Sequence, residues 1–179
     1  MSIIIGVISK NNQLFLGADT RAILPSDKID DDYDKIFKIR PDLYFGITGI
    51  AEYGLAIKDR LLMLPDINQL FIVEIIQYLD SIYTDKHSHS TVLLSGRLET
   101  NQAFIWNKNT LGENRLIKSD GLDTLYSINS NDNTEFFEKR FVQEVGQTNF
   151  DFIMSIRNTI EYASTIDHTI SSTCKIVCL

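Results

Sequence analysis

Ser2 is the residue of this 179-residue sequence whose position offers the most distinctive chemistry. A serine hydroxyl is a weak nucleophile until a base removes its proton. After removal of Met1, Ser2 carries such a base itself, because a free α-amino group is attached to the same Cα. The pKa of an α-amino group is about 7.7–8.0, so about a quarter of these groups are neutral near pH ~7.4. We expect Met1 to be removed, because methionine aminopeptidase accepts a small residue at position 2. If Met1 stays, Ser2 is only the residue after the initiator.

The histidines and cysteines do not have the spacing of a metal site. His87 and His89 form an H-x-H pair in an expected loop, with no companion ligand nearby. Cys174 and Cys178 are four residues apart, which is neither a zinc nor a redox spacing. On a strand both would lie on one face, so we expect buried core thiols. We therefore expect no metal and no other cofactor.

Two strands and an acidic loop are expected to surround Ser2. The β-branched run over residues 2–9 predicts a buried strand, and turn-forming residues over 10–13 join it to a second strand over 14–20. A polar loop is expected over 21–34, with Asp30, Asp31 and Asp32 exposed to solvent. Two short strands follow, over 35–39 and 43–47.

The rest of the chain alternates between helical and strand patterns. Helices are expected over 50–64 and 67–83, with Pro65 ending the first and Asp66 capping the second. Four strands follow, over 91–98, 102–107, 115–118 and 124–128. A helix is expected over 134–145, another begins at Thr148 with Asp151 in its first turn, and a closing strand covers 173–179. The residues expected to face inward are Leu70, Val73, Ile75, Ile76 and Leu79 in the second helix, and Phe152, Ile156, Ile160 and Ala163 in the last.

This order of elements predicts an α+β fold of one domain over residues 1–179. Strands, two helices, strands, two helices and a last strand suit a four-layer αββα sandwich. In that arrangement, two stacked antiparallel sheets lie between two pairs of helices.

Four segments carry a resemblance to a known family. They are SIIIGV from Ser2, GADTRA from Gly17, DKIFKI from Asp34 and FGITGIA from Phe45. Together they resemble the proteasome β-subunit family, and the bacterial peptidases of the HslV type are the most similar. The resemblance implies the fold of the N-terminal-nucleophile (Ntn) hydrolases and a peptidase whose first residue is the nucleophile. Ser2 stands where that family usually has threonine.

The resemblance also implies roles for further residues. Asp19, Lys35 and Gly49 have the mutual separations of the family's catalytic aspartate, catalytic lysine and oxyanion glycine. Ser130 resembles the family's active-site serine before a helix. Asp167, with Ser171 nearby, resembles the family's aspartate and serine before the last strand.

These roles are chemically consistent. A charged Lys35 would lower the pKa of the Ser2 amine, but a drop of one unit raises its neutral fraction only about threefold. Positioning of the base must therefore supply most of the roughly 10²–10⁴-fold effect of general-base catalysis. Asp19 would hold Lys35 charged, and the Gly49 N–H would bind an oxyanion at a helix N-terminus. Ser130 and Asp167 would orient the amine.

Each of these residues also has an ordinary structural explanation. Asp19 can be a turn acid at a strand end, and Lys35 a solvated lysine. Gly49 can be a turn or close-packing glycine. Ser130 can be a helix N-cap, and Asp167 a solvated acid at a helix end.

Composition excludes other classes of function. The net charge of −7 and the absence of a basic stripe argue against nucleic acid as a partner. No apolar run is long enough to span a membrane, no targeting segment is visible, and we expect a cytoplasmic protein. The sequence has no phosphate-binding loop, so the chain itself is not expected to hydrolyse ATP.

The resemblance implies a polypeptide substrate and a homo-oligomeric ring, with an ATP-dependent unfoldase as a possible partner. Helix faces rich in Leu, Ile and Phe also favour an oligomer. Two alternatives stay open. One is a catalytically inactive structural subunit of the same fold, and the other is an Ntn amidase that acts on small molecules.

Overall fold

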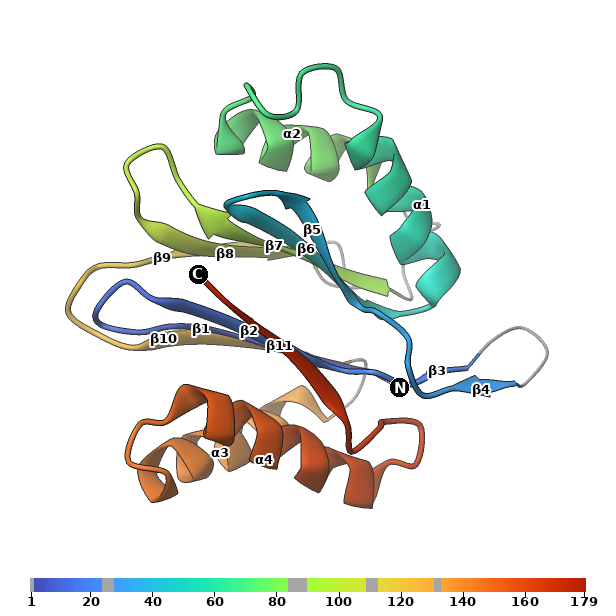
Figure 1. Cartoon of the computed structure of the whole chain (residues 1–179), viewed down its shortest axis with the longest axis vertical. Helices are drawn as coiled ribbons and strands as arrows, with labels where there is room; N and C mark the ends of the chain where they lie inside the picture. The colour runs from blue at the N-terminus through green and yellow to red at the C-terminus, as the bar shows by residue number, and fades with distance from the viewer. Residues whose placement is uncertain (1, 24–27, 84–89, 109–112, 131–132) are drawn as a thin grey trace.

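The protein forms four layers in the order helices, sheet, sheet, helices (Figure 1). The computed structural model describes residues 2–23, 28–83, 90–108, 113–130 and 133–179. Helices α1 and α2 cover the outer face of one sheet, and α3 and α4 cover the outer face of the other. The expected αββα sandwich is therefore confirmed.

The first sheet has four antiparallel strands in the order β10-β1-β2-β11. Its strands are β1 (Ile3–Ile8), β2 (Leu14–Asp19), β10 (Leu125–Ser130) and β11 (Cys174–Cys178). Ile4 lies opposite Ala18, and Ile3 lies opposite Ser130. This register brings the end of β2 and the end of β10 to the start of β1, where Ser2 lies.

The second sheet has five antiparallel strands in chain order. They are β5 (Ile36–Arg40), β6 (Leu43–Gly49), β7 (Ser90–Arg97), β8 (Ala103–Lys108) and β9 (Asn114–Lys118). A small hairpin of β3 (Ala22–Ile23) and β4 (Ile29–Asp30) precedes them. The expectation of a loop throughout 21–34 was therefore wrong, because Ile23 and Ile29 pair across this hairpin.

The helices are α1 (Ala51–Leu62), α2 (Ile72–Ile82), α3 (Thr134–Gln147) and α4 (Phe152–Ile166). Two expected helix starts were wrong. Asp66 does not cap α2, which begins after Phe71, whose N–H donates to the Glu74 carboxylate. Thr148 ends α3 instead of starting α4, and Asp151 caps α4 by accepting the Met154 N–H at 2.9 Å.

Strand β1 contributes to two cores because its side chains alternate between the two faces of the sheet. Ile3, Ile5 and Val7 pack against α3 and α4, where Ile156, Ile160 and Ala163 are buried as expected. Ile4 and Ile8 pack against the other sheet.

The inward face of α2 was predicted only in part. Ile75 and Leu79 are fully buried as expected, together with Ile72. Val73 is 57% exposed, so its place on the apolar face was wrong. Ile72 lies on the buried side instead, because it has helical spacing to Ile75 and Leu79 and Val73 does not.

The cysteines do not lie in the core. Cys174 is half-buried and Cys178 is exposed, and both are free thiols. Their strand, β11, is the last in the order of its sheet and, among the described strands, pairs with β2 alone. An edge strand has less cover than a central one, which the spacing of the two cysteines did not reveal. Within the described residues, no helix combines the length and apolar character needed to cross a membrane.

Gly17 allows α4 to approach β2 closely. A methyl group at Gly17 would lie 2.3 Å from Ile156 Cγ2. Because Cγ2 belongs to the stiff branched part of a helical isoleucine, relief requires movement of α4 or β2. We expect Gly17→Ala to lower the free energy of unfolding by about 1–3 kcal/mol, measured by urea titration.

Gly146 supplies the matched control. A methyl group there has no neighbouring atom within 4 Å in the described structure, and Gly146 lies within α3. Gly146→Ala should leave stability unchanged or raise it by up to about 1 kcal/mol. Equal unfolding midpoints for the two variants would contradict the close contact between Gly17 and Ile156.

Candidate active site

Ser2, Lys35 and Asp19 form a buried hydrogen-bonded cluster. The Lys35 ammonium donates to Ser2 Oγ at 3.0 Å and to both carboxylate oxygens of Asp19 at 2.8 Å. Ser2, Asp19 and Lys35 are 5%, 0% and 4% exposed. The structure thus brings together three residues that are distant in sequence and were predicted to share a site.

Asp19 is held in place by backbone donors from several segments. The N–H of Ile3 donates to Asp19 Oδ1 at 2.9 Å, and the N–H of Arg21 donates to Oδ2 at 3.2 Å. The N–H of Ser171 reaches Oδ2 at 3.4 Å. A fully buried carboxylate needs such donors, because removing it from water without partners is costly. The solvated turn acid that Asp19 could have been is therefore excluded.

Lys35 lies directly before β5, and its carbonyl accepts the Ile47 N–H of β6 at 3.0 Å. Its side chain is buried, so the solvated lysine is excluded as well. Burial lowers the pKa of Lys35, and the nearby Asp19 carboxylate opposes this shift. The positive charge of Arg21 adds to the lowering. The ammonium at Ser2 Oγ is therefore less firmly protonated than a lysine in water.

A cavity of about 510 Å³ opens beside this cluster. Its lining comes from the β3–β4 hairpin, the end of β6 and the start of α1. The lining residues are Ser2, Arg21, Ala22, Ile23, Tyr33, Lys35, Ile47, Thr48, Gly49, Ile50, Ala51, Glu52 and Leu55. A substrate side chain could therefore lie on a largely apolar wall next to Ser2 Oγ.

Gly49 is the last residue of β6 and lies just before the N-terminus of α1. Its φ of +88° is in the region that favours glycine, so the turn itself requires this residue type. Gly49 also lines the cavity with Ser2. Gly49 therefore serves the turn, and it also lies beside the cavity that Ser2 lines.

Ser130 lies on the strand beside Ser2, whereas Asp167 lies at the end of α4. Ser130 ends β10 opposite Ile3, so it lies on the strand beside Ser2, and its carbonyl accepts the Thr134 hydroxyl at 3.0 Å. Asp167 follows α4 and accepts the N–H of Thr169 at 2.8 Å and its hydroxyl at 2.6 Å. Burial works to raise the pKa of Asp167, but these hydrogen bonds outweigh it and the pKa is lowered. Asp167 thus shapes the turn that leads to Ser171.

Arg21 is a site residue to which the sequence assigned no role. Its Nε donates to Asp31 Oδ1 at 2.5 Å, and its Nη1 donates to the carbonyl of His168. Arg21 also lines the cavity beside Ser2. It therefore ties the acidic loop and the turn after α4 to the end of β2. The sequence held one signal for Arg21, which is its position two residues after Asp19 inside the GADTRA segment.

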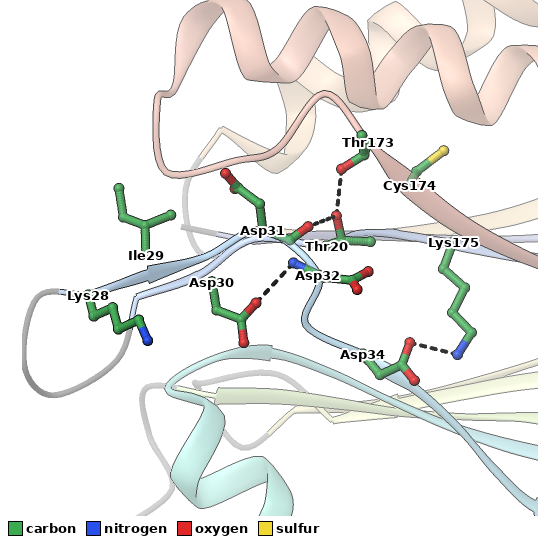
Figure 2. Close-up of a pocket in the computed structure, with 10 residues that line it drawn as sticks. All are labelled: Thr20, Lys28, Ile29, Asp30, Asp31, Asp32, Asp34, Thr173, Cys174 and Lys175. Atoms are coloured by element: carbon green, nitrogen blue, oxygen red, sulfur yellow. Dashed lines mark hydrogen bonds and ion pairs between the residues drawn. The ribbon is translucent and has the colours of Figure 1, made fainter.

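The acidic loop lines a second, larger cavity of about 870 Å³ (Figure 2). In this cavity Asp34 pairs with Lys175 at 2.6 Å, and Thr20 bonds to Thr173. Asp31 and Asp32 are exposed, as expected for a solvated loop, whereas Asp30 is partly buried and belongs to β4. Ser2 and Lys35 do not line this cavity, so its greater size does not make it the better candidate for hydrolysis.

Within the described residues, no group of three or more His, Cys, Asp or Glu side chains is arranged to hold a metal ion. His87 and His89 lie outside the described residues, and so does Met1.

Comparison with known proteins gives a consistent result at the level of fold. No protein-family model matches the sequence, and no curated protein matches it. Among solved structures, the chain is similar to Anbu (ancestral beta-subunit) from Yersinia bercovieri, with a TM-score of 0.73 and 12% identity over 98% of this chain and 81% of that one. It is equally similar to eukaryotic HslV from Trypanosoma brucei, with a TM-score of 0.73 and 12% identity over 99% of this chain and 98% of that one. The sequence resemblance is thereby confirmed for the fold, and the chain has the Ntn-hydrolase fold of the proteasome-type subunits.

Proposed function

We propose that the chain is a peptidase subunit in which Ser2, freed by removal of Met1, is the nucleophile. The observation that carries this proposal is the contact of Ser2 Oγ with Lys35 Nζ at 3.0 Å, beside a cavity that can receive a substrate side chain. Asp19 anchors that ammonium through both of its carboxylate oxygens. The fold shared with HslV and Anbu supports the same activity.

The proposed reaction has two halves. The free amine of Ser2 takes the hydroxyl proton, and Oγ adds to the substrate carbonyl to form a tetrahedral intermediate. The Gly49 N–H and the Lys35 ammonium stabilise the negative charge that develops. The C–N bond then breaks, and the leaving amine takes the proton from the Ser2 amine. Water, activated by the same amine, releases the acyl group from Oγ.

Ser130 and Asp167 are proposed to support this reaction rather than to react. Ser130 lies on the strand beside Ser2, and its proposed role is to orient the amine. Asp167 holds the turn whose Ser171 N–H reaches Asp19. The proposed substrate is an unfolded polypeptide, as the family resemblance implies, and the largely apolar wall beside Ser2 would receive one of its side chains.

A covalent label tests the nucleophile directly. Intact mass spectrometry of the purified protein should show loss of Met1 and one adduct after treatment with a β-lactone, with peptide mapping placing the adduct on Ser2. Ser2→Ala should remove the adduct and lower peptide hydrolysis by at least about 10³-fold, because Ser2 carries the hydroxyl that Lys35 contacts. Retention of Met1 with no adduct would contradict the proposed peptidase and favour the inactive structural subunit. Turnover of a simple acyl amide without any peptide turnover would favour the small-molecule amidase.

The ion pair can be tested apart from the nucleophile. Lys35→Met leaves the Asp19 carboxylate buried without its cation, so we expect a loss of about 3–5 kcal/mol in the free energy of unfolding. Adding Asp19→Asn removes the unpaired charge and should recover part of that stability. Activity should stay absent in the double variant, because Ser2 Oγ has lost its ammonium. Additive losses of stability in the double variant would show that the two side chains do not interact.

We also propose a homo-oligomeric ring, to which an ATP-dependent unfoldase could deliver substrate. Exposed apolar side chains on α3 and α4 motivate this proposal, namely Phe136, Val142, Ile153, Met154 and Ile166. A monomer would leave them in water, whereas a symmetric interface would bury them. Light scattering at physiological salt should give a mass several times the 20.4 kDa of the chain. A monomeric mass would contradict the ring.

A further inference from the structure

The turn that joins β6 to α1 lacks the usual means of fixing a helix start. Helix N-termini are commonly fixed by a Ser, Thr, Asp or Asn side chain that accepts a backbone N–H. Here the cap position is Ile50, whose side chain has no acceptor, and the cap has no side-chain hydrogen bond. This turn also contains Gly49, which lines the cavity beside Ser2. Some other group must therefore hold it.

Ser90 supplies that group from the neighbouring strand. Its Oγ donates to the Ile50 carbonyl at 2.9 Å, and its backbone lies opposite Gly49 in the β6–β7 pairing. Ser90 is 0% exposed, so its hydroxyl is shielded from water, although Ile50 at the other end of the bond is 42% exposed. The Ser90 side chain of β7 thus fixes the carbonyl of Ile50, the residue directly after Gly49.

Tyr83 extends this support beyond the strand. Its hydroxyl donates to the carbonyl of Ser90. Burial raises the pKa of Tyr83 to about 12, so the hydroxyl stays protonated and remains a donor at neutral pH. The Lys108 ammonium lies 5.2 Å from the centre of the Tyr83 ring and pairs with Asp80 at 2.6 Å. The hydrogen bonds therefore run from the end of α2 to the turn at Gly49.

We propose that Ser90 and Tyr83 are positioning residues that hold the Gly49–Ile50 turn so that the Gly49 N–H faces the reacting carbonyl. The catalytic part of this inference rests on the function proposed above. An oxyanion donor is effective only within a narrow range of about 2.7–3.1 Å from the developing charge. The start of α1 has no side-chain cap among the described residues, so the hydroxyl groups of Ser90 and Tyr83 supply side-chain anchoring that the helix start lacks.

A matched pair of substitutions on one strand tests the proposal. Ser90→Ala removes the hydroxyl that holds the turn. Ser95→Ala makes the same change further along β7, where Ser95 is also 0% exposed and its hydroxyl has no hydrogen-bond partner in the described part of the chain. Both variants lose one buried oxygen from the same strand. Only the first loses a bond to the turn.

Ser90→Ala should lower kcat for a peptide by roughly 10- to 100-fold and leave KM within about twofold, because an oxyanion contact acts mainly in the transition state. Ser95→Ala should stay within about twofold of the parent in both constants. Tyr83→Phe keeps the ring and removes only the hydroxyl, so it should lower kcat less, by roughly three- to tenfold. Equal kcat values for Ser90→Ala and Ser95→Ala would overturn the proposal.

A second measurement does not depend on activity. Hydrogen exchange followed by mass spectrometry should show faster exchange over residues 48–54 in Ser90→Ala than in Ser95→Ala, with β8 unchanged in both. Unchanged exchange in that segment would overturn the positioning role. If the parent protein neither hydrolyses peptides nor reacts with a β-lactone, the proposed function fails, and the exchange result alone decides whether Ser90 holds the turn.

Discussion

The buried ion pair between Asp19 and Lys35 is the interaction on which the site depends. Removing two such charges from water costs several kcal/mol for each ion, so the pair persists only with complete hydrogen bonding. Asp19 receives that bonding from Lys35 and from the backbone N–H groups of Ile3, Arg21 and Ser171. These donors belong to segments far apart in the sequence. The carboxylate therefore fixes the start of β1, the end of β2 and the turn before β11 around one point.

The same ion pair explains why the Lys35 ammonium beside Ser2 differs from that of a lysine in water. Burial lowers the pKa of Lys35, while the Asp19 carboxylate works in the opposite direction. Neither effect acts on a lysine in water. The result is an ammonium held at a fixed distance from Ser2 Oγ, able to stabilise negative charge there without moving. Electrostatic preorganisation of this kind is effective because nothing has to reorganise when charge develops.

Much of the fold could be predicted from the sequence, because it depends on local patterns, whereas the grouping of Ser2, Asp19 and Lys35 was predicted from the resemblance to a known family. Alternation in β1 and helical periodicity around Ile156 and Ile160 reflect burial directly. The helix starts near Asp66 and Thr148 were wrong. Helix α2 begins instead where carboxylates of Glu74 and Glu99 accept the N–H groups of Phe71 and Ile72, and α4 begins where Asp151 accepts the Met154 N–H. Ser90 and Tyr83 could not be found, because their hydrogen bonds go to backbone carbonyls brought near only by strand pairing. Cys178 was misplaced because spacing does not reveal which strand forms the edge.

Serine at position 2 makes the hydrogen bond from Lys35 more important than it would be for threonine. The methyl group on the Cβ atom of threonine restricts χ1 and so limits the directions in which its hydroxyl can point. Ser2 lacks that methyl, and its hydroxyl has three staggered positions open to it. The Lys35 ammonium selects one of them, since Ser2 Oγ accepts its hydrogen bond at 3.0 Å. Asp19 therefore acts on Ser2 indirectly, because the carboxylate that anchors Lys35 also determines the direction in which the Ser2 hydroxyl points.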